Sequence, residues 1–221
     1  MKIKIDQSLN IIHSAIEKYK KIAVACSFGK DSVVILHLAR VIKPDIQVFS
    51  VMTPFKPMET LHYKEYLSAL WGLNIKTYMH PTNFPGDMYK TDPNECCRIF
   101  KVNPTREAIE DLKLDAWISG LRATEGPTRR NLPVIQSDKG LDKINPILEW
   151  TEAEIWLYHA IYNIPVHPLY LQGYRSLGCF PCSGIGGEHE RSERWKGTNK
   201  CGGECGIHTY GLKTGEKILH E

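Results

Sequence analysis

IAVACSFGKDSVVILHLARVI, residues 22–42, decides the fold of this 221-residue chain. Residues 22–27 are short, apolar and followed by a glycine-containing loop, a pattern typical of a buried β-strand. Residues 32–42 carry the apolar side chains of a helix. The stretch therefore predicts a strand, a loop and a helix in direct succession.

The same alternation continues on both sides of this stretch. Helices are expected at 7–20, at 58–72 with an end at Gly72, at 104–114 with Pro104 at the start, and at 151–164 with a capping box of Thr151 and Glu154. Further strands are expected at 46–53, 75–80 and 116–121, and a loop at 122–146. Strands that alternate with helices predict an α/β fold, a three-layer doubly wound sheet that is mainly parallel.

Length and composition indicate one globular domain with an appendage. A chain of this size buries about 70% of its unfolded surface, so it can form a real core. We expect an α/β domain over 1–164 and an irregular segment over 165–221, rich in Cys and Gly, that packs on the same domain.

Composition also excludes several classes of protein. Hydrophobic residues make up 42% and charged residues 24%, which argues against disorder. No run approaches the ~20 apolar residues of a membrane helix, and Asp6 and Gln7 interrupt any signal peptide. A net charge of +3 is too weak to indicate nucleic acid by itself. We therefore expect a cytoplasmic protein without a membrane partner.

The loop after the first strand is a candidate anion site. A helix start offers free N–H groups and the positive end of a dipole, and glycine lets the backbone approach a phosphate. The spacing is not that of a Walker loop, and an ordinary capped helix start is the alternative interpretation. The candidate residues are Ser27, Phe28, Gly29, Lys30, Asp31 and Ser32.

Seven cysteines suggest metal binding or redox chemistry, because the chain carries no export signal. Two close pairs, Cys96 with Cys97 and Cys179 with Cys182, supply four thiolates for an iron–sulfur cluster or a tetrahedral zinc. Adjacent cysteines fit the usual zinc spacing poorly, which favours a cluster over zinc. Buried free thiols are the alternative.

Cys205 lies in the glycine-rich stretch ECGIH, with His208 nearby, and is a candidate reactive thiol. A surface cysteine is an equal alternative, and Cys201 is a second candidate that could also pair with Cys205. Arginine forks bind phosphate and sulfate well. The basic candidates are Arg98, Lys101, Arg122, Arg129, Arg130, Arg191 and Arg194.

These motifs together resemble the assimilatory adenylylsulfate and phosphoadenylylsulfate reductases, in the family's order and over nearly the whole chain. The motifs are SFGKDS (27–32), CCRIFK (96–101), GLRATEGPTR (120–129), NPILEWTEAEIW (145–156), PLYLQGYRSLGCFPC (168–182), ERSERW (190–195) and ECGIH (204–208). The resemblance implies an adenine nucleotide α-hydrolase-like (PP-loop) fold. It also implies a [4Fe–4S] cluster on Cys96, Cys97, Cys179 and Cys182.

The resemblance further implies thiol-dependent reduction of adenylylsulfate, or of its 3′-phosphorylated form, to sulfite in sulfate assimilation. Cys205 would be the nucleophile that becomes S-sulfonated, and thioredoxin or a glutaredoxin-like thiol would release sulfite. Lys101 would lie between cluster and substrate. The other residues expected on the nucleotide are those of the 27–32 loop with Gly120, Arg122, Arg129, Arg191, Arg194 and His208.

One departure from the family keeps other functions open. The loop retains Lys30-Asp31-Ser32, as in ATP pyrophosphatases and the small subunit of sulfate adenylyltransferase. An ATP-dependent sulfur-transfer enzyme, for example in DNA phosphorothioation, is therefore an alternative, and only this alternative brings a nucleic-acid partner. A non-catalytic nucleotide sensor that carries metal is a third. The oligomeric state is left open, a homo-oligomer included.

Overall fold

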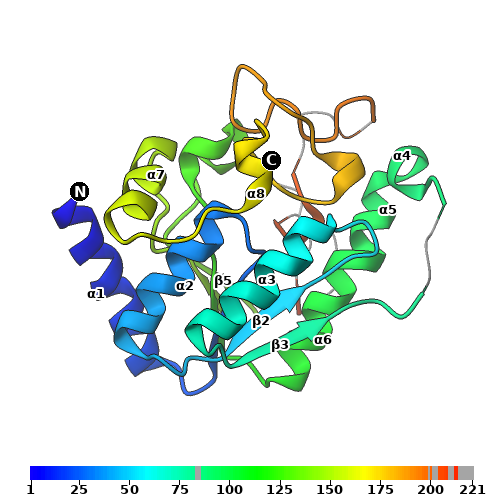
Figure 1. Cartoon of the computed structure of the whole chain (residues 1–221). Helices are drawn as coiled ribbons and strands as arrows, with labels where there is room; N and C mark the ends of the chain where they lie inside the picture. The colour runs from blue at the N-terminus through cyan, green and yellow to red at the C-terminus, as the bar shows by residue number, and fades with distance from the viewer. Residues whose placement is uncertain (83–85, 199, 201–203, 209–211, 214–221) are drawn as a thin grey trace.

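A six-stranded sheet with the strand order β3-β2-β1-β4-β6-β5 forms the centre of the computed structural model (Figure 1). The structure describes residues 1–82, 86–198, 200, 204–208 and 212–213. The strands are β1 (Ile22–Ala25), β2 (Val48–Val51), β3 (Ile75–Tyr78), β4 (Ala116–Ile118), β5 (Ile135–Asp138) and β6 (Leu141–Ile144). Every neighbouring pair is parallel except β5 with β6. The chain adds β2 and β3 on one side of β1 and then places β4 on the other side, so strand order reverses beside β1.

Helices cover both faces of this sheet. Ile22 and Val24 of β1 lie in a core shared with α1, α2, α3 and α7, whereas Ala23 between them faces the opposite core, shared with α6. The larger helices are α1 (Lys2–Lys18), α2 (Lys30–Ile42), α3 (Met58–Trp71), α6 (Asn103–Asp111) and α7 (Glu152–Ile161). The three-layer, doubly wound architecture expected from the sequence is confirmed.

Short sequence signals, such as a glycine, a capping box or a proline, mark the ends of several helices. Gly72 takes a left-handed conformation with φ 57° after α3, and Thr151 and Glu154 form the expected capping box of α7. Pro104 lies in the first turn of α6. Helix α1 begins five residues before the expected position, because Ile5 extends its buried face.

The expectation of a loop over residues 122–146 is wrong in part. Residues 135–144 form the antiparallel hairpin of β5 and β6. The two turn residues, Lys139 and Gly140, both have positive φ, which a tight two-residue hairpin turn requires. Strand β5 is at the edge of the sheet and is mostly polar, so it shows no apolar strand pattern.

The first cysteine pair lies on a continuous helical stretch of residues 93–111. Helix α5 (Pro93–Cys97) passes into a π-helical turn, η1 (Arg98–Val102), and then into α6. The wider turn includes Lys101, and such turns occur often at functional sites. Sequence reasoning expected only the α6 part of this stretch to be helical.

Short helices and loops make up the rest of the described chain. They are α4 (Met88–Thr91), η2 (Ala123–Glu125), η3 (Pro127–Arg129), α8 (Pro168–Leu171), η4 (Phe180–Cys182) and η5 (Gly206–His208). Figure 1 shows loops after α8, drawn in orange, at one end of the molecule. No helix within the described residues has the length and apolar character needed to cross a membrane.

Candidate active site

A pocket of about 200 Å³ opens at the carboxyl ends of the central strands. Ala25 ends β1, Val51 ends β2 and Ser119 follows β4, and all three line the pocket. In doubly wound sheets, ligands bind at this edge, where strand order reverses. Twelve of the sequence-predicted residues line it: Ser27, Gly29, Lys30, Asp31, Ser32, Lys101, Gly120, Arg129, Arg191, Arg194, Cys205 and His208.

The loop after β1 forms one wall of this pocket. Gly29 is the N-cap residue of α2, and the hydroxyls of Ser27 and Ser32 lie 3.2 Å apart. Tyr170 of α8 accepts a hydrogen bond of 2.8 Å from the Lys30 backbone N–H. Tyr170 therefore holds the C-terminal part of the chain against the helix start, a contact that sequence reasoning missed.

Two of the predicted nucleotide contacts do not line the pocket. The Phe28 ring is fully buried in the core, packed edge-on against Tyr63 with ring centroids 6.5 Å apart. Its backbone has a positive φ of 63°, so Phe28 contributes the shape of the loop. The Arg122 side chain is also fully buried, and its Nε donates a hydrogen bond of 2.5 Å to Asp31.

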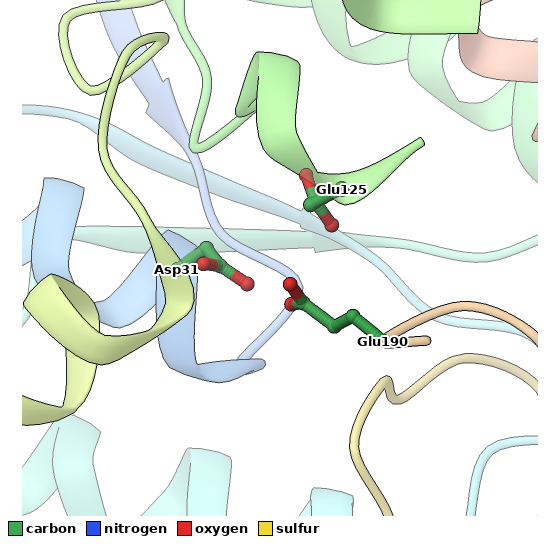
Figure 2. A group of neighbouring side chains, drawn as sticks. All are labelled: Asp31, Glu125 and Glu190. Atoms are coloured by element: carbon green, nitrogen blue, oxygen red, sulfur yellow. The ribbon is translucent and has the colours of Figure 1, made fainter. Parts of the chain in front are cut away.

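Three carboxylates meet beside the loop: Asp31 from the start of α2, Glu125 from η2 and Glu190 from the C-terminal segment (Figure 2). One oxygen of each lies within 4.8 Å of the others. Arginine and lysine side chains neutralise the group, since Arg122 pairs with Asp31 and Glu190, and Arg129 pairs with Glu125. This pairing explains the cluster as a buried ionic network and leaves no need for a metal ion there.

Lys30 belongs to the same network. Its ammonium donates hydrogen bonds of 2.5 Å to Glu190 and 2.8 Å to the Arg175 carbonyl, and its side chain is 1% exposed. The negative charges of Asp31 and Glu190, with Tyr170, outweigh burial and raise the pKa of Lys30. The lysine of the retained Lys-Asp-Ser motif thus forms ion pairs with carboxylates of the protein itself.

Cys205 lines the same pocket. The Lys101 ammonium lies 3.6 Å from the Cys205 sulfur. A hydrogen bond from the Cys97 thiol, together with the charge of Lys101, outweighs burial and holds the pKa of Cys205 well below its usual value while Cys97 is a free thiol. When Cys97 ligates a metal, the Lys101 ammonium remains to favour the thiolate form of Cys205. Cys201, the other candidate thiol, lies outside the described residues.

Glu204 anchors the segment that carries Cys205. The Arg129 guanidinium donates to both Glu204 carboxylate oxygens, at 2.6 and 2.7 Å, and Arg191 donates a third hydrogen bond of 2.9 Å. Glu204 in turn accepts 2.8 Å from the Cys205 N–H. These charge-assisted bonds place the thiol in the pocket. The sequence pointed to both arginines but assigned them to substrate alone.

His208 is held by a residue that sequence reasoning missed. Lys143 of β6 lies with its ammonium 2.9 Å from His208 Nδ1. Burial, reinforced by the charge of Arg129, lowers the pKa of Lys143 to about 7, and burial and Lys143 lower that of His208. The strand that supplies Lys143 lies in the region expected to be a loop.

Arg194 joins the pocket to the second cysteine pair. Its guanidinium donates to the carbonyls of Cys182, at 2.9 Å, and Leu177, at 3.0 Å. A Cβ atom on Gly178 would lie 2.3 Å from the same guanidinium, so a side chain at this position would displace the Arg194 guanidinium. Arg194 lines the pocket and also fixes the loop of residues 177–182.

The four predicted ligand cysteines come together. Cys96, Cys97, Cys179 and Cys182 are all buried and line one small cavity next to the pocket, with Lys101 in the wall between them. Within the described part of the chain, no three of these sulfur atoms lie within 4.8 Å of one another.

Two buried hydrogen-bond donors near the cysteines have no acceptor within the described ranges, which bears on the kind of ligand that the cavity can hold. Lys200 Nζ and Trp195 Nε1 are buried without a hydrogen-bond partner among the described residues. Trp195 packs in the same cluster as the cysteines, and the charge of Lys200 acts on Cys96 and Cys97. Buried donors of this kind are costly unless an acceptor meets them. The donors and thiols are compatible with an anionic metal cluster.

Gly120 offers a test of the loop as a nucleotide site. A Cβ atom there would lie 2.8 Å from the backbone of Asp31 and Ser32, so Gly120→Ala must displace the helix start. Overpacking of this kind costs about 1–3 kcal/mol, and we expect AMP affinity, measured by calorimetry, to fall roughly tenfold.

Gly126→Ala is the matched control for Gly120→Ala. Gly126 has an extended backbone, and the nearest neighbouring atom to its Cβ position, on Arg191, is 4.0 Å away. The control should bind AMP like the wild type. Equal affinity of the two variants would contradict a role for this loop in binding.

Fold and pocket define a protein of the nucleotide-binding α/β class with a cysteine in its pocket and a cysteine-lined cavity beside it. The chain belongs to the family with the phosphoadenosine phosphosulfate reductase domain, whose model matches residues 21–185. The resemblance read from the motifs is therefore confirmed.

Relatives cover most of the chain. A Shouchella clausii protein named adenosine 5′-phosphosulfate reductase is 34% identical over an alignment of 220 residues that covers 94% of this chain and 90% of that protein. A Chelativorans protein of the same name is 34% identical over an alignment of 215 residues that covers 92% of this chain and 86% of that protein.

Solved structures confirm the fold. Phosphoadenylyl-sulfate reductase from Candida auris has a TM-score of 0.72 at 20% identity, covering 80% of this chain and 90% of that one. FMN adenylyltransferase from Candida glabrata has a TM-score of 0.64 at 19% identity, covering 80% and 61%.

Proposed function

We propose that this protein catalyses the thiol-dependent reduction of adenylylsulfate to sulfite and AMP in sulfate assimilation. The observation that carries the proposal is the position of Cys205. Its sulfur lies 3.6 Å from the Lys101 ammonium in the pocket that also contains the loop after β1. Relatives named adenosine 5′-phosphosulfate reductase support the same substrate.

The chemistry follows from a thiolate in this pocket. The Cys205 thiolate attacks the sulfate sulfur, a sulfur–sulfur bond forms, the bond from sulfur to the phosphate oxygen breaks, and AMP leaves. A thiol of a thioredoxin- or glutaredoxin-like protein in the cytoplasm then attacks the Cys205 sulfur and displaces sulfite. The second thiol of that donor resolves the mixed disulfide, so two thiols become one disulfide as S(VI) becomes S(IV).

Several pocket residues contribute to these reaction steps. Lys101 stabilises the Cys205 thiolate before attack, and its remaining N–H donors face the incoming anion. Arg129 and Arg191 hold Cys205 in place through Glu204. Ser27, Gly29 and Ser32 offer hydroxyls and a close backbone approach to the nucleotide phosphate.

The cavity beside the pocket supports a [4Fe–4S] cluster held by Cys96, Cys97, Cys179 and Cys182. The adjacent pair Cys96 and Cys97 fits the usual zinc spacing poorly, which favours the cluster over zinc. When bound, such a cluster supplies a fixed negative charge beside Lys101.

Metal analysis tests the cluster directly. Protein purified without oxygen should be brown and contain about four irons per chain, the content of a four-thiolate cubane. The reason is the set of four buried thiols around one cavity. A colourless preparation with stoichiometric zinc would contradict this assignment.

The partners of Lys30 argue against the ATP-dependent alternative. In that alternative the lysine of the Lys-Asp-Ser motif should be available to a polyphosphate, whereas here Glu190 and the Arg175 carbonyl hold it. The retained motif is therefore explained by an ion pair within the protein.

Product analysis tests the function as a whole. The protein should release sulfite from adenylylsulfate plus dithiol, and faster than from the 3′-phosphorylated form. Pyrophosphate release from ATP without sulfite would instead support the sulfur-transfer alternative. Nucleotide binding without either product would support a sensor.

A further inference from the structure

Lys56 lies on the loop between β2 and α3, where two contacts fix its position. The Thr53 hydroxyl is 3.2 Å from the Cys179 sulfur, and the Phe55 carbonyl accepts a hydrogen bond of 2.8 Å from the Phe180 N–H. The turn closes with a bond of 3.1 Å from the Lys56 N–H to the Thr53 carbonyl. Lys56 thus enters the pocket from a rigid base beside the second cysteine pair.

Most cations of the pocket already have partners. Lys30 is paired with Glu190, and Arg129 and Arg191 with Glu204. Arg194 donates to main-chain carbonyls. Within the described chain, the Lys56 ammonium has no hydrogen bond or ion pair, so its three donors are available to a ligand.

The surroundings of Lys56 disfavour its charged form unless an anion is bound nearby. Burial, together with the positive charges of Lys101 and Arg194, lowers the pKa of Lys56 to about 8, against the opposing effect of Cys179. Lys56 therefore remains mostly protonated at neutral pH. The Lys56 side chain is partly buried, so it has lost part of its hydration, and a negative group that enters the pocket would replace that hydration.

We propose that Lys56 binds the sulfo group of the substrate and keeps hold of it after transfer to Cys205. The inference rests on the proposed function. The sulfur under attack must lie next to the Cys205 thiol. Lys56 lines the same pocket as Cys205 and Lys101, and it follows Phe55, which packs in the same cluster as Cys205. The phosphate is expected at the loop after β1.

Binding measurements separate this role from others. Calorimetry on the Cys205→Ser protein, which cannot turn over, should show adenylylsulfate bound roughly 30-fold more weakly after Lys56→Met, since a charge-assisted contact is lost. Affinity for AMP, which lacks the sulfo group, should change less than about threefold. Lys56→Arg should restore part of the loss, and the exposed control Lys43→Met should behave like the parent.

Other results would overturn the inference. Unchanged affinity for adenylylsulfate in Lys56→Met, or an equal loss for AMP, would show that Lys56 does not contact the sulfo group. Loss of iron from Lys56→Met would show that it supports the cysteine cavity. If the wild type makes no sulfite, the proposed function falls first; sulfite formation with unaffected Lys56 variants removes only this inference.

Discussion

Cys205→Ser is expected to abolish sulfite formation from adenylylsulfate, by more than about 1,000-fold. Attack at sulfur needs a thiolate, and a serine hydroxyl stays protonated even 3.6 Å from Lys101. A serine ester would also offer no sulfur–sulfur bond for an incoming thiol to cleave. Sulfite release with dithiol measures the effect directly.

Nucleotide affinity and iron content of Cys205→Ser should stay near wild-type values, because the cysteine cavity is lined by other thiols. Cys201→Ser is the matched control and should retain activity. Wild-type protein given substrate without reductant should carry a sulfonate on the peptide with Cys205. A sulfonate on Cys201 would identify the wrong thiol, and sulfite without either adduct would refute the mechanism.

Much of the fold was readable because its signals are local. The apolar run of residues 22–25, the left-handed Gly72 and the capping box at Thr151 each report on a few neighbouring residues. The hairpin of β5 and β6 escaped notice because an edge strand needs no continuous apolar pattern. Its turn at Lys139-Gly140 was the one available signal.

The residues of the site could be predicted from the sequence, but the ion pairs between them could not. Motifs led to Cys205 and to the four cavity cysteines, and the structure brings them together. Lys30, however, finds Glu190 at a sequence separation of 160 residues. No local pattern shows that a basic residue will meet a carboxylate so far along the chain, so a neutralised cation and a ligand-binding cation look alike in sequence.

The ion pairs around Lys30 should contribute strongly to the free energy of unfolding. Glu190→Ala tests this contribution. Glu190 pairs with both Lys30 and Arg122, whose side chains are 1% and 0% exposed. Asp31 remains beside both cations, but removing this carboxylate leaves two buried positive charges incompletely neutralised, which costs about 3–5 kcal/mol. For a chain of this length the thermal midpoint, followed by circular dichroism, should fall by roughly 10 °C.

The matched control for Glu190→Ala is Glu188→Ala, because Glu188 is exposed in the same segment and contributes its backbone carbonyl to Arg175. It should change the free energy of unfolding by less than about 0.5 kcal/mol. Adding Lys30→Met to Glu190→Ala should recover part of the loss, because it removes one of the stranded charges. If Glu190→Ala instead behaves like Glu188→Ala, Lys30 does not depend on Glu190, and its ammonium is available to a phosphate after all.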